Sequence, residues 1–253
     1  MPAAPAGDGT GRTPLRVATC NVRELLDDSR ALREVLRAAA ADVLCLQEVP
    51  THPLAAHRLG DLAADAGLQV VAAGRAGAGT AVLAAGRVDV RAAAVRALPT
   101  PRLRARRPVR RRGTAEALVR VVAGAGWSVP VLVRSVHLGL DAAERVDHAL
   151  RLLPDAGAAG RGAPLVLAGD LNEEPGGPAR AVLTSRLSDA AELAGGAFAT
   201  FPARAPRRRI DAVLADGRLA VTAVGTPGVQ GAAAATDHLA VVADLLVPAT
   251  GDA

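Results

Sequence analysis

Short apolar runs bounded by polar turns recur along this chain and predict β-strands. The clearest runs cover 15–22, 42–49, 129–138, 164–168 and 239–246. They are rich in Val, Leu and Ala and are flanked by turn-forming residues, which is typical of buried strands. Weaker strand patterns lie at 70–73, 80–84, 88–98, 117–123, 210–215 and 219–224.

Helical periodicity occurs in fewer places, and capping residues open two of them. Asp27-Asp28-Ser29 precedes one such segment, and Asp141 with Glu144 forms a capping box before another. Two more helices are expected from Pro53 and near Ala179. The side chains expected to face the core are Leu32, Val35, Leu36 and Ala39 in the first helix and Val146, Ala149, Leu150 and Leu153 in the second. His148 is expected on the outward, solvated side of the second helix.

The strands are too numerous for a single sheet that buries all of them. We therefore expect an α/β fold of two sheets packed face to face with helices outside. A length of 253 residues and 50% hydrophobic content suit one domain, which we place at 14–248 with tails at 1–13 and 249–253.

Cysteine content and hydropathy bear on the compartment. Cys20 and Cys45 are the two cysteines, and both lie within apolar runs, so we expect small core residues in a reducing environment. The first thirteen residues lack the apolar core of a secretory signal, and no window is long and uncharged enough to span a membrane. These features predict a cytoplasmic protein.

The basic charge is less informative than its size suggests. The net charge is +5 and all 30 basic residues are arginine, seven of them between Arg102 and Arg112, where we expect an exposed loop. Arginine neutralises phosphates, so a nucleic-acid partner is consistent with this charge. A GC-rich genome also enriches arginine, so composition alone leaves a polyanionic partner open.

Polar residues suited to phosphate or a hard cation stand where apolar runs break off. They are Asn21, Glu48, His137 and the Gly169-Asp170-Leu171-Asn172 quartet. If the strands converge on one sheet edge, these side chains form one acidic, histidine-containing site. Such a site is typical of a hydrolase.

Three further residues extend this candidate site. Asp211 lies in a short strand and can orient His238, which would make that imidazole a general base. Asp237 adjoins His238, and both can serve one site only from a loop or strand start. On an extended segment Asp170 and Asn172 would point to the same face, whereas an Asx turn is the structural alternative.

Six short motifs resemble, in order, those of the endonuclease/exonuclease/phosphatase superfamily, the group of DNase I-like phosphoesterases. The motifs are Thr19-Cys20-Asn21, Leu46-Gln47-Glu48, Ser135-Val136-His137-Leu138, Gly169-Asp170-Leu171-Asn172, Arg209-Ile210-Asp211 and Thr236-Asp237-His238-Leu239. The resemblance covers Leu15 to Val247 and is greatest to the general bacterial branch. It implies a four-layer α/β/β/α sandwich of two mainly antiparallel sheets.

The resemblance also implies roles for these residues. Glu48 would be the principal Mg²⁺ ligand, with Asn21 and Asp237 near the ion and Mn²⁺ a possible substitute; oxygen ligands suit such cations. His238, oriented by Asp211, would activate water. The remaining catalytic candidates are Asp170 and Asn172, which would hold the nucleophile and phosphate, and His137, which would stabilise phosphoryl oxygens or protonate the leaving group.

The chain departs from the family pattern in two places. Many members carry a mid-chain tyrosine near the phosphate, and this sequence has none, so Arg110, Arg111 or Arg112 is a candidate phosphate clamp. Arg23 stands where abasic-site nucleases carry a carboxylate, which makes a second metal doubtful.

Three functions follow from these observations. The first is a Mg²⁺-dependent phosphodiesterase or nuclease acting on DNA or RNA, supported by the basic segments 102–112 and 207–209. The second keeps the chemistry on a small-molecule, lipid or inositol phosphate. The third is a non-catalytic module that binds polyanions. The sequence indicates neither the oligomeric state nor an endo- or exo- mode of cleavage.

Overall fold

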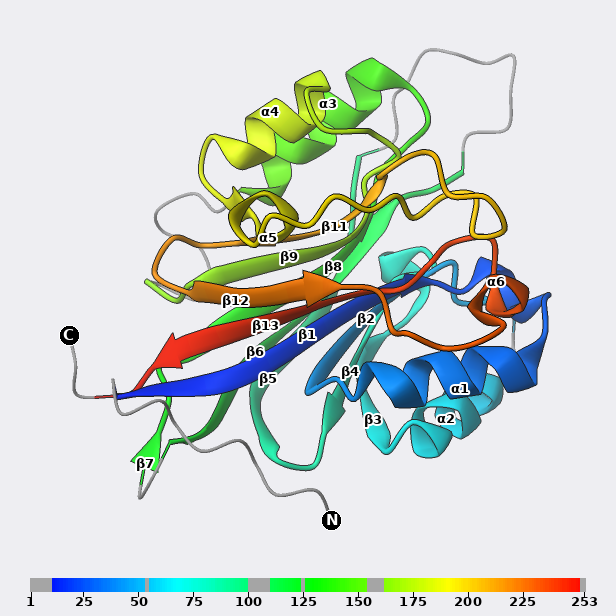
Figure 1. Ribbon diagram of the computed structural model, residues 1–253. Coiled ribbons are helices and arrows are strands. Elements are labelled where there is room, and N and C mark those ends of the chain that lie inside the picture. Colours follow the sequence, from blue (N-terminus) through cyan, green and yellow to red (C-terminus); the bar gives the residue numbers. More distant parts are fainter. Residues whose placement is uncertain (1–10, 53–54, 100–109, 124–125, 154–161, 251–253) are drawn as a thin grey trace.

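The central strands of this protein place alternate side chains in two separate apolar layers. In β1 (Arg12–Asn21), Leu15 and Val17 enter one layer while Ala18 and Cys20 enter another. Period-two alternation of this kind requires cover on both faces of the sheet. The computed structural model, which describes residues 11–52, 55–99, 110–123, 126–153 and 162–250, provides that cover with a second sheet and with helices (Figure 1).

The first sheet has six strands in the order β12-β13-β1-β2-β4-β3. β1 and β2 run parallel, and the other neighbours are antiparallel. Besides β1, its strands are β2 (Val43–Gln47), β3 (Leu68–Ala73), β4 (Ala81–Ala85), β12 (Ala220–Gly225) and β13 (Val241–Pro248).

The second sheet has the order β10-β11-β9-β8-β6-β5, and β7 pairs with β6. β8 and β9 are its parallel pair. Its strands are β5 (Val88–Ala97), β6 (Gly113–Ala123), β7 (Gly126–Trp127), β8 (Val131–His137), β9 (Leu165–Asp170), β10 (Ser188–Asp189) and β11 (Asp211–Ala215).

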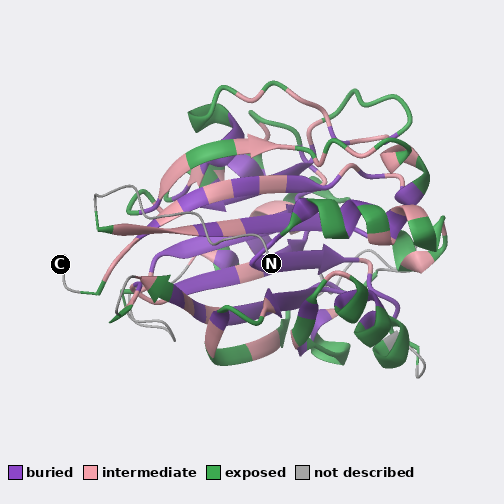
Figure 2. Cartoon of the chain, turned by 60° about the horizontal axis from the view of Figure 1, so that its bottom comes forward, coloured by how far each residue is buried: buried purple, intermediate pink, exposed green. Residues whose placement is uncertain are grey.

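Helices cover the outer face of each sheet. α1 (Ser29–Ala39), α2 (Ala55–Asp65) and the short α6 (Ala232–Ala235) pack on the first sheet, and α3 (Ala142–Leu152) and α4 (Pro178–Thr184) pack on the second. α5 (Ala190–Leu193) lies beside β11 and β12. Two 3₁₀ turns, Arg23–Leu25 and Arg75–Gly77, complete the described elements. Figure 2 shows the buried strands between the exposed outer sides of the helices.

Most element predictions are confirmed, including the two-sheet sandwich. The Asp28 side chain accepts bonds from the amides of Arg30 and Ala31 at the start of α1, and Asp141 does the same for Ala143 and Glu144 in α3. A carboxylate at this position satisfies amides that have no partner inside the helix.

Three local predictions are wrong. Leu150 is exposed rather than internal because Ala149 and Leu152 form the packed side of α3. His148, expected to be solvated, is fully buried and Nε2 lies 2.9 Å from the carbonyl oxygen of Pro99. Arg12 and Thr13, assigned to the tail, belong to β1, where they pair with Pro248 and Val247 of β13. Residues 1–10 and 251–253 lie outside the described ranges, as do Pro53 and Leu54.

The strand directions bring many polar strand ends to one end of the sandwich. β1 and β2 end there in one sheet, and β8 and β9 end there in the other. β11 begins at the same end because Asp211 pairs with Asp170. The expected single sheet edge is therefore wrong: the candidate residues come from two facing sheets. No helix in the described part of the chain is long and apolar enough to cross a membrane.

Candidate active site

Asp170, the last residue of β9, lies at the centre of the candidate site. Its register partner in β8 is His137, and Nε2 of that ring lies 3.4 Å from Asp170 Oδ2. Gly169 permits this close approach because its φ is +158° and a Cβ atom there would lie 2.0 Å from the carbonyl oxygen of Val136. Burial and the charge of Asp211 raise the pKa of Asp170 to about 7.

Asn21 links the two sheets at this point. Its Nδ2 donates to Glu48 Oε1 at 3.3 Å and to Asp170 Oδ2 at 3.1 Å, while its Oδ1 accepts from the amide of Arg23. Glu48 directly follows β2 in a left-handed conformation with φ +53°. The side-chain amide therefore holds two carboxylates of different sheets beside each other.

His137 is a buried imidazole between those two carboxylates. Besides Asp170, it approaches Glu48, whose Oε1 lies 3.9 Å from His137 Nε2. Burial, followed by the positive charge of Arg112, holds the pKa of His137 well below its usual range. The ring is therefore neutral at pH 7 and can offer an N–H to an anion.

His238 and Asp211 form a pair on the other side of Asp170. His238 Nδ1 lies 3.1 and 2.9 Å from the two carboxylate oxygens of Asp211, and Nε2 lies 3.9 Å from Asp170 Oδ2. Burial opposes the imidazolium charge, but the hydrogen bond to Asp211 and the surrounding carboxylates outweigh it and raise the pKa of His238 to about 9. The ring of Phe201 lies 4.8 Å from the His238 ring, centroid to centroid.

Asp170, Asp211 and His238 form the one group in the described ranges whose ligating atoms all lie within 4.8 Å of one another. His238 Nδ1 is already bonded to Asp211, so this group is arranged for proton transfer more than for metal ligation.

Asp237 reaches the site from the loop before β13. This is the expected position, because adjacent residues such as Asp237 and His238 would point to opposite faces within a strand. The hydroxyl of Thr236 donates to the carbonyl oxygen of Asn21 at 2.8 Å and fixes this loop to β1. Arg23 Nε lies 3.6 Å from Asp237 Oδ2, and the Arg23 guanidinium also bonds to Asp27. The corner that a second metal would occupy therefore carries a protein cation.

Asn172 is near the site but not in the extended geometry expected for it. Its φ is +49°, and its amide N–H donates to Asp170 Oδ1 at 2.8 Å, which is the Asx-turn alternative. Its Nδ2 donates to the carbonyl oxygen of Leu138. The turn holds Asp170 in place and leaves Asn172 Oδ1 facing no bonded donor among the described residues.

The three candidate arginines differ in their surroundings. Arg110 and Arg111 are exposed, and Arg110 lies 3.4 Å from Glu24. Arg112 is only 8% exposed, which corrects the expected loop exposure at this position. Burial lowers the pKa of Arg112, and the nearby charges of Asp170, Glu144 and Glu48 oppose that shift. The arginines at 102, 104, 106 and 107 lie outside the described ranges.

A cavity of about 500 Å³ opens beside these residues. Glu48 and His137 line it, together with Arg75 and the segment 110–112, whereas Asp170, Asp211 and His238 do not. Its wall therefore combines positive charge with the Glu48 carboxylate, a combination that suits a phosphate and a cation.

The other basic segment, 207–209, is largely neutralised. Arg209 bonds to both oxygens of Asp189, and Arg208 lies 3.3 Å from Glu174. The support that this segment lent to a polyanion is therefore weaker than its sequence suggests.

One buried polar contact below the site was not anticipated. Gln47 Nε2 donates to Ser135 Oγ at 3.0 Å across the two sheets, and Gln47 Oε1 accepts from Thr19. Both Gln47 and Ser135 are fully buried. A glutamine directly after the apolar run 43–46 was the available signal, since a buried amide requires partners.

Glu48 has the surroundings expected of a cation ligand. Its side chain is 24% exposed, toward the cavity, and no donor in the described ranges bonds to Oε2. Carboxylate oxygens are the ligands that Mg²⁺ prefers. Asn21 differs, because its oxygen is bonded to the Arg23 amide and its nitrogen faces both carboxylates.

The site geometry agrees with a family-level match. The model of the endonuclease/exonuclease/phosphatase family matches residues 18–238, a range that includes Asn21 and His238. The chain belongs to this family. Members of the endonuclease/exonuclease/phosphatase family hydrolyse phosphoester bonds, generally with a divalent metal ion, so this chain is a phosphoester hydrolase.

Solved structures support the fold of this family member. An endonuclease/exonuclease/phosphatase from Bacteroides vulgatus has a TM-score of 0.74 at 20% identity, covering 92% of this chain and 98% of that one. The mannosyl-6-phosphatase Bt3783 of Bacteroides thetaiotaomicron scores 0.71 at 20% identity, covering 91% and 99%. TDP2 of D. rerio, complexed with a single-strand DNA product, scores 0.68 at 17% identity, covering 92% and 98%. No curated protein matches the sequence significantly.

Proposed function

We propose that this hydrolase cleaves its phosphoester by in-line attack of water from the side of His238, next to a single divalent cation beside Glu48. The observation that carries the proposal is the position of Asp170. Its carboxylate lies within 4 Å of Asn21, His137 and His238, which come from three different segments of the chain.

The cation would be held by Glu48, with Asp237 and Asn21 beside it. A bound Mg²⁺ or Mn²⁺ supplies Lewis acidity to the phosphoryl oxygens. The Arg23 guanidinium next to Asp237 favours one ion over two.

His238 accepts the proton of the attacking water. The bond from Nδ1 to Asp211 fixes the ring orientation and stabilises the imidazolium that forms. With a pKa of about 9 the ring is a strong base, and it accepts the proton from its neutral form, which is the minor form at pH 7. Asp170, held by the amide of Asn172, orients the water from the opposite side.

His137 donates to a phosphoryl oxygen rather than protonating the leaving group. Its pKa is lowered by burial and by Arg112, so the ring has no imidazolium proton to release at pH 7. Arg112 anchors the phosphate, in place of the tyrosine that this sequence lacks. No carboxylate in the described ranges lies within ion-pair distance of its guanidinium, whereas a phosphate offers the bidentate geometry it prefers.

Nucleic acid is the substrate class that we propose first. Arg75, Arg110 and Arg111 line the cavity and can contact further phosphates of a backbone. The similar TDP2 fold with bound single-strand DNA is consistent with this proposal. A small phosphorylated molecule is the second candidate, supported by the limited volume of the cavity, about 500 Å³, and by the sugar phosphatase among the similar folds.

The test is a phosphoester panel assayed with Mg²⁺, Mn²⁺ and EDTA. The panel contains plasmid, single-strand DNA, RNA, sugar phosphates, inositol phosphates and lipid phosphodiesters, and the His238→Ala variant is the blank. We expect turnover that EDTA abolishes. Cleavage of lipid or small esters with all nucleic acids intact would reject the first substrate class.

Two variants separate catalysis from binding. Arg112→Ala should lower kcat/KM by roughly 100-fold because a buried phosphate contact is lost, whereas exposed Arg186→Ala should change nothing. Strong DNA binding that is unaffected by Glu48→Ala, with no turnover of any ester, would favour the non-catalytic module instead.

A further inference from the structure

A smaller pocket opens from the wall of the catalytic cavity. It measures about 200 Å³ and shares the segment 49–52, Arg75 and Gly79 with the larger cavity. We call it the apolar pocket; the residues that it does not share are Ala56, Leu59, Ala73, Gly74 and Thr80. The two cavities are therefore adjacent, and both are open to solvent along this shared wall, so one ligand can occupy parts of both.

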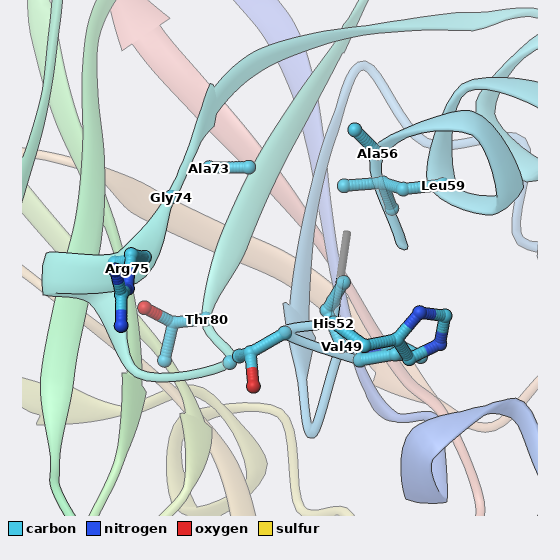
Figure 3. A pocket seen from close by; sticks show the side chains of 11 residues that line it. Val49, His52, Ala56, Leu59, Ala73, Gly74, Arg75 and Thr80 are labelled. Carbon is cyan, nitrogen blue, oxygen red and sulfur yellow. The ribbon is translucent and has the colours of Figure 1, made fainter. Parts of the chain in front are cut away.

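The lining of the apolar pocket is small and largely uncharged. Figure 3 shows Ala56 and Leu59, from α2, facing Ala73 at the end of β3, with His52 and Arg75 nearer the rim. The hydroxyl of Thr80 donates its hydrogen bond to the carbonyl oxygen of Gly77. No carboxylate among the described residues lines the apolar pocket, and Ala56, Leu59 and Ala73 are apolar, so it favours an uncharged group.

The position of the apolar pocket relates it to one end of the reaction. In-line displacement places the leaving group opposite the nucleophile. His238 and Asp211 do not line the catalytic cavity, whereas Glu48 and His137 do. The cavity, and the apolar pocket beyond it, therefore lie on the side of the departing alcohol.

We propose that the apolar pocket binds the uncharged ring or alkyl body of the leaving alcohol and so, within the small-molecule class of substrates, selects phosphoesters of apolar alcohols. The inference rests on the proposed function, which supplies the direction of attack. The volume of the apolar pocket, about 200 Å³, suits a six-membered ring or a chain of roughly four to six carbons, because a cavity of about 150 Å³ in another protein holds benzene.

The experiment uses methyl, n-butyl and cyclohexylmethyl phosphates and their methyl diesters. These alcohols have similar acidity, so differences between them report binding of the alcohol. Two readouts are collected: kcat/KM with the native protein, and Kd by calorimetry with His238→Ala in the presence of Mn²⁺. The second readout needs no turnover.

We expect the cyclohexylmethyl ester to bind at least about tenfold more tightly than the methyl ester. Ala73→Phe and, independently, Ala56→Phe fill the apolar pocket and should reduce that ratio to about one. Ala64→Phe, exposed on the same helix α2 but outside the pocket, should leave it unchanged.

Three outcomes have distinct meanings. Equal Kd values for the methyl, n-butyl and cyclohexylmethyl esters would overturn the proposal. So would a preference for the cyclohexylmethyl ester that survives in both Ala73→Phe and Ala56→Phe. A preference lost on filling, without hydrolysis by native protein of these esters or of any member of the phosphoester panel, would support the apolar pocket and reject the proposed function. A dinucleotide that binds more tightly than the cyclohexylmethyl ester, with that advantage lost in Ala73→Phe, would assign the pocket to a nucleoside instead.

Discussion

The side-chain amide of Asn21 donates to Oδ2 of Asp170 at 3.1 Å and thereby connects β1 of one sheet with β9 of the other. The same nitrogen lies 3.3 Å from Glu48 Oε1. Without this donor, the His137 ring alone would lie between the two carboxylates. Asn21 thus lowers the cost of holding two carboxylates close together when no metal is bound.

Asn21→Asp tests that relationship. In EDTA the variant should lose about 1–3 kcal/mol of unfolding free energy, because a buried donor becomes a third carboxylate. Millimolar Mg²⁺ should restore more stability to the variant than to the native protein. Urea denaturation with and without Mg²⁺ measures both effects. Gln69→Glu, on an exposed position of β3, serves as the control, and equal losses in both variants would contradict the assignment.

Asp211→Asn should uncouple the protonation of His238. Burial lowers the pKa of His238, and Asp211 is the largest of the groups that together raise it to about 9, so NMR titration of that ring should show a lower pKa in the variant, where only Asp170 and Asp237 still oppose burial. A histidine pKa that is higher in the folded than in the unfolded chain stabilises the fold. This stabilisation is complete at pH values below the pKa of the unfolded chain and is lost as the pH rises through 9.

The stability difference between native and Asp211→Asn protein in EDTA should therefore be largest near pH 6 and shrink toward pH 9.5. It should not exceed about 3 kcal/mol. A difference that grows with pH over this range would show that Asp211 does not act through the charge of His238.

Glu48→Gln should weaken Mg²⁺ and Mn²⁺ binding by roughly tenfold or more, because an amide replaces the carboxylate that faces the cavity. Calorimetric titration of the EDTA-treated, dialysed protein measures it. Glu24→Gln is a matched control, since Glu24 lines the same cavity but lies beside Arg110. Equal metal affinity in native and Glu48→Gln protein would remove Glu48 from the metal site.

Gly169→Ala should cost about 3 kcal/mol or more of unfolding free energy. The added Cβ would meet the Val136 carbonyl oxygen at 2.0 Å, and that oxygen belongs to the β8 backbone. Gly176→Ala has a left-handed φ of +85° but open space around the new atom, so it should cost less. Thermal and urea unfolding of both variants compare a steric clash with backbone strain alone.

Local pattern was enough to predict much of this architecture. The capping carboxylates Asp28 and Asp141 and the buried positions Leu32 and Leu36 follow from neighbours within a few residues, and the structure has them as expected. His148 and Leu150 were assigned to the wrong sides of α3. Helical phase is uncertain in a segment whose apolar stripe is this narrow.

The order of polar residues at strand ends was likewise visible in the sequence, and it pointed to the correct family. Periodicity and motif order are properties of neighbouring residues, so they survive in the linear chain. The burial of Arg112, the Asn21–Asp170 bond across two sheets, the neutralised arginines at 208 and 209 and the apolar pocket were decided by tertiary structure alone. Each depends on distances between segments up to 149 residues apart, which only the packing of one sheet against the other sets.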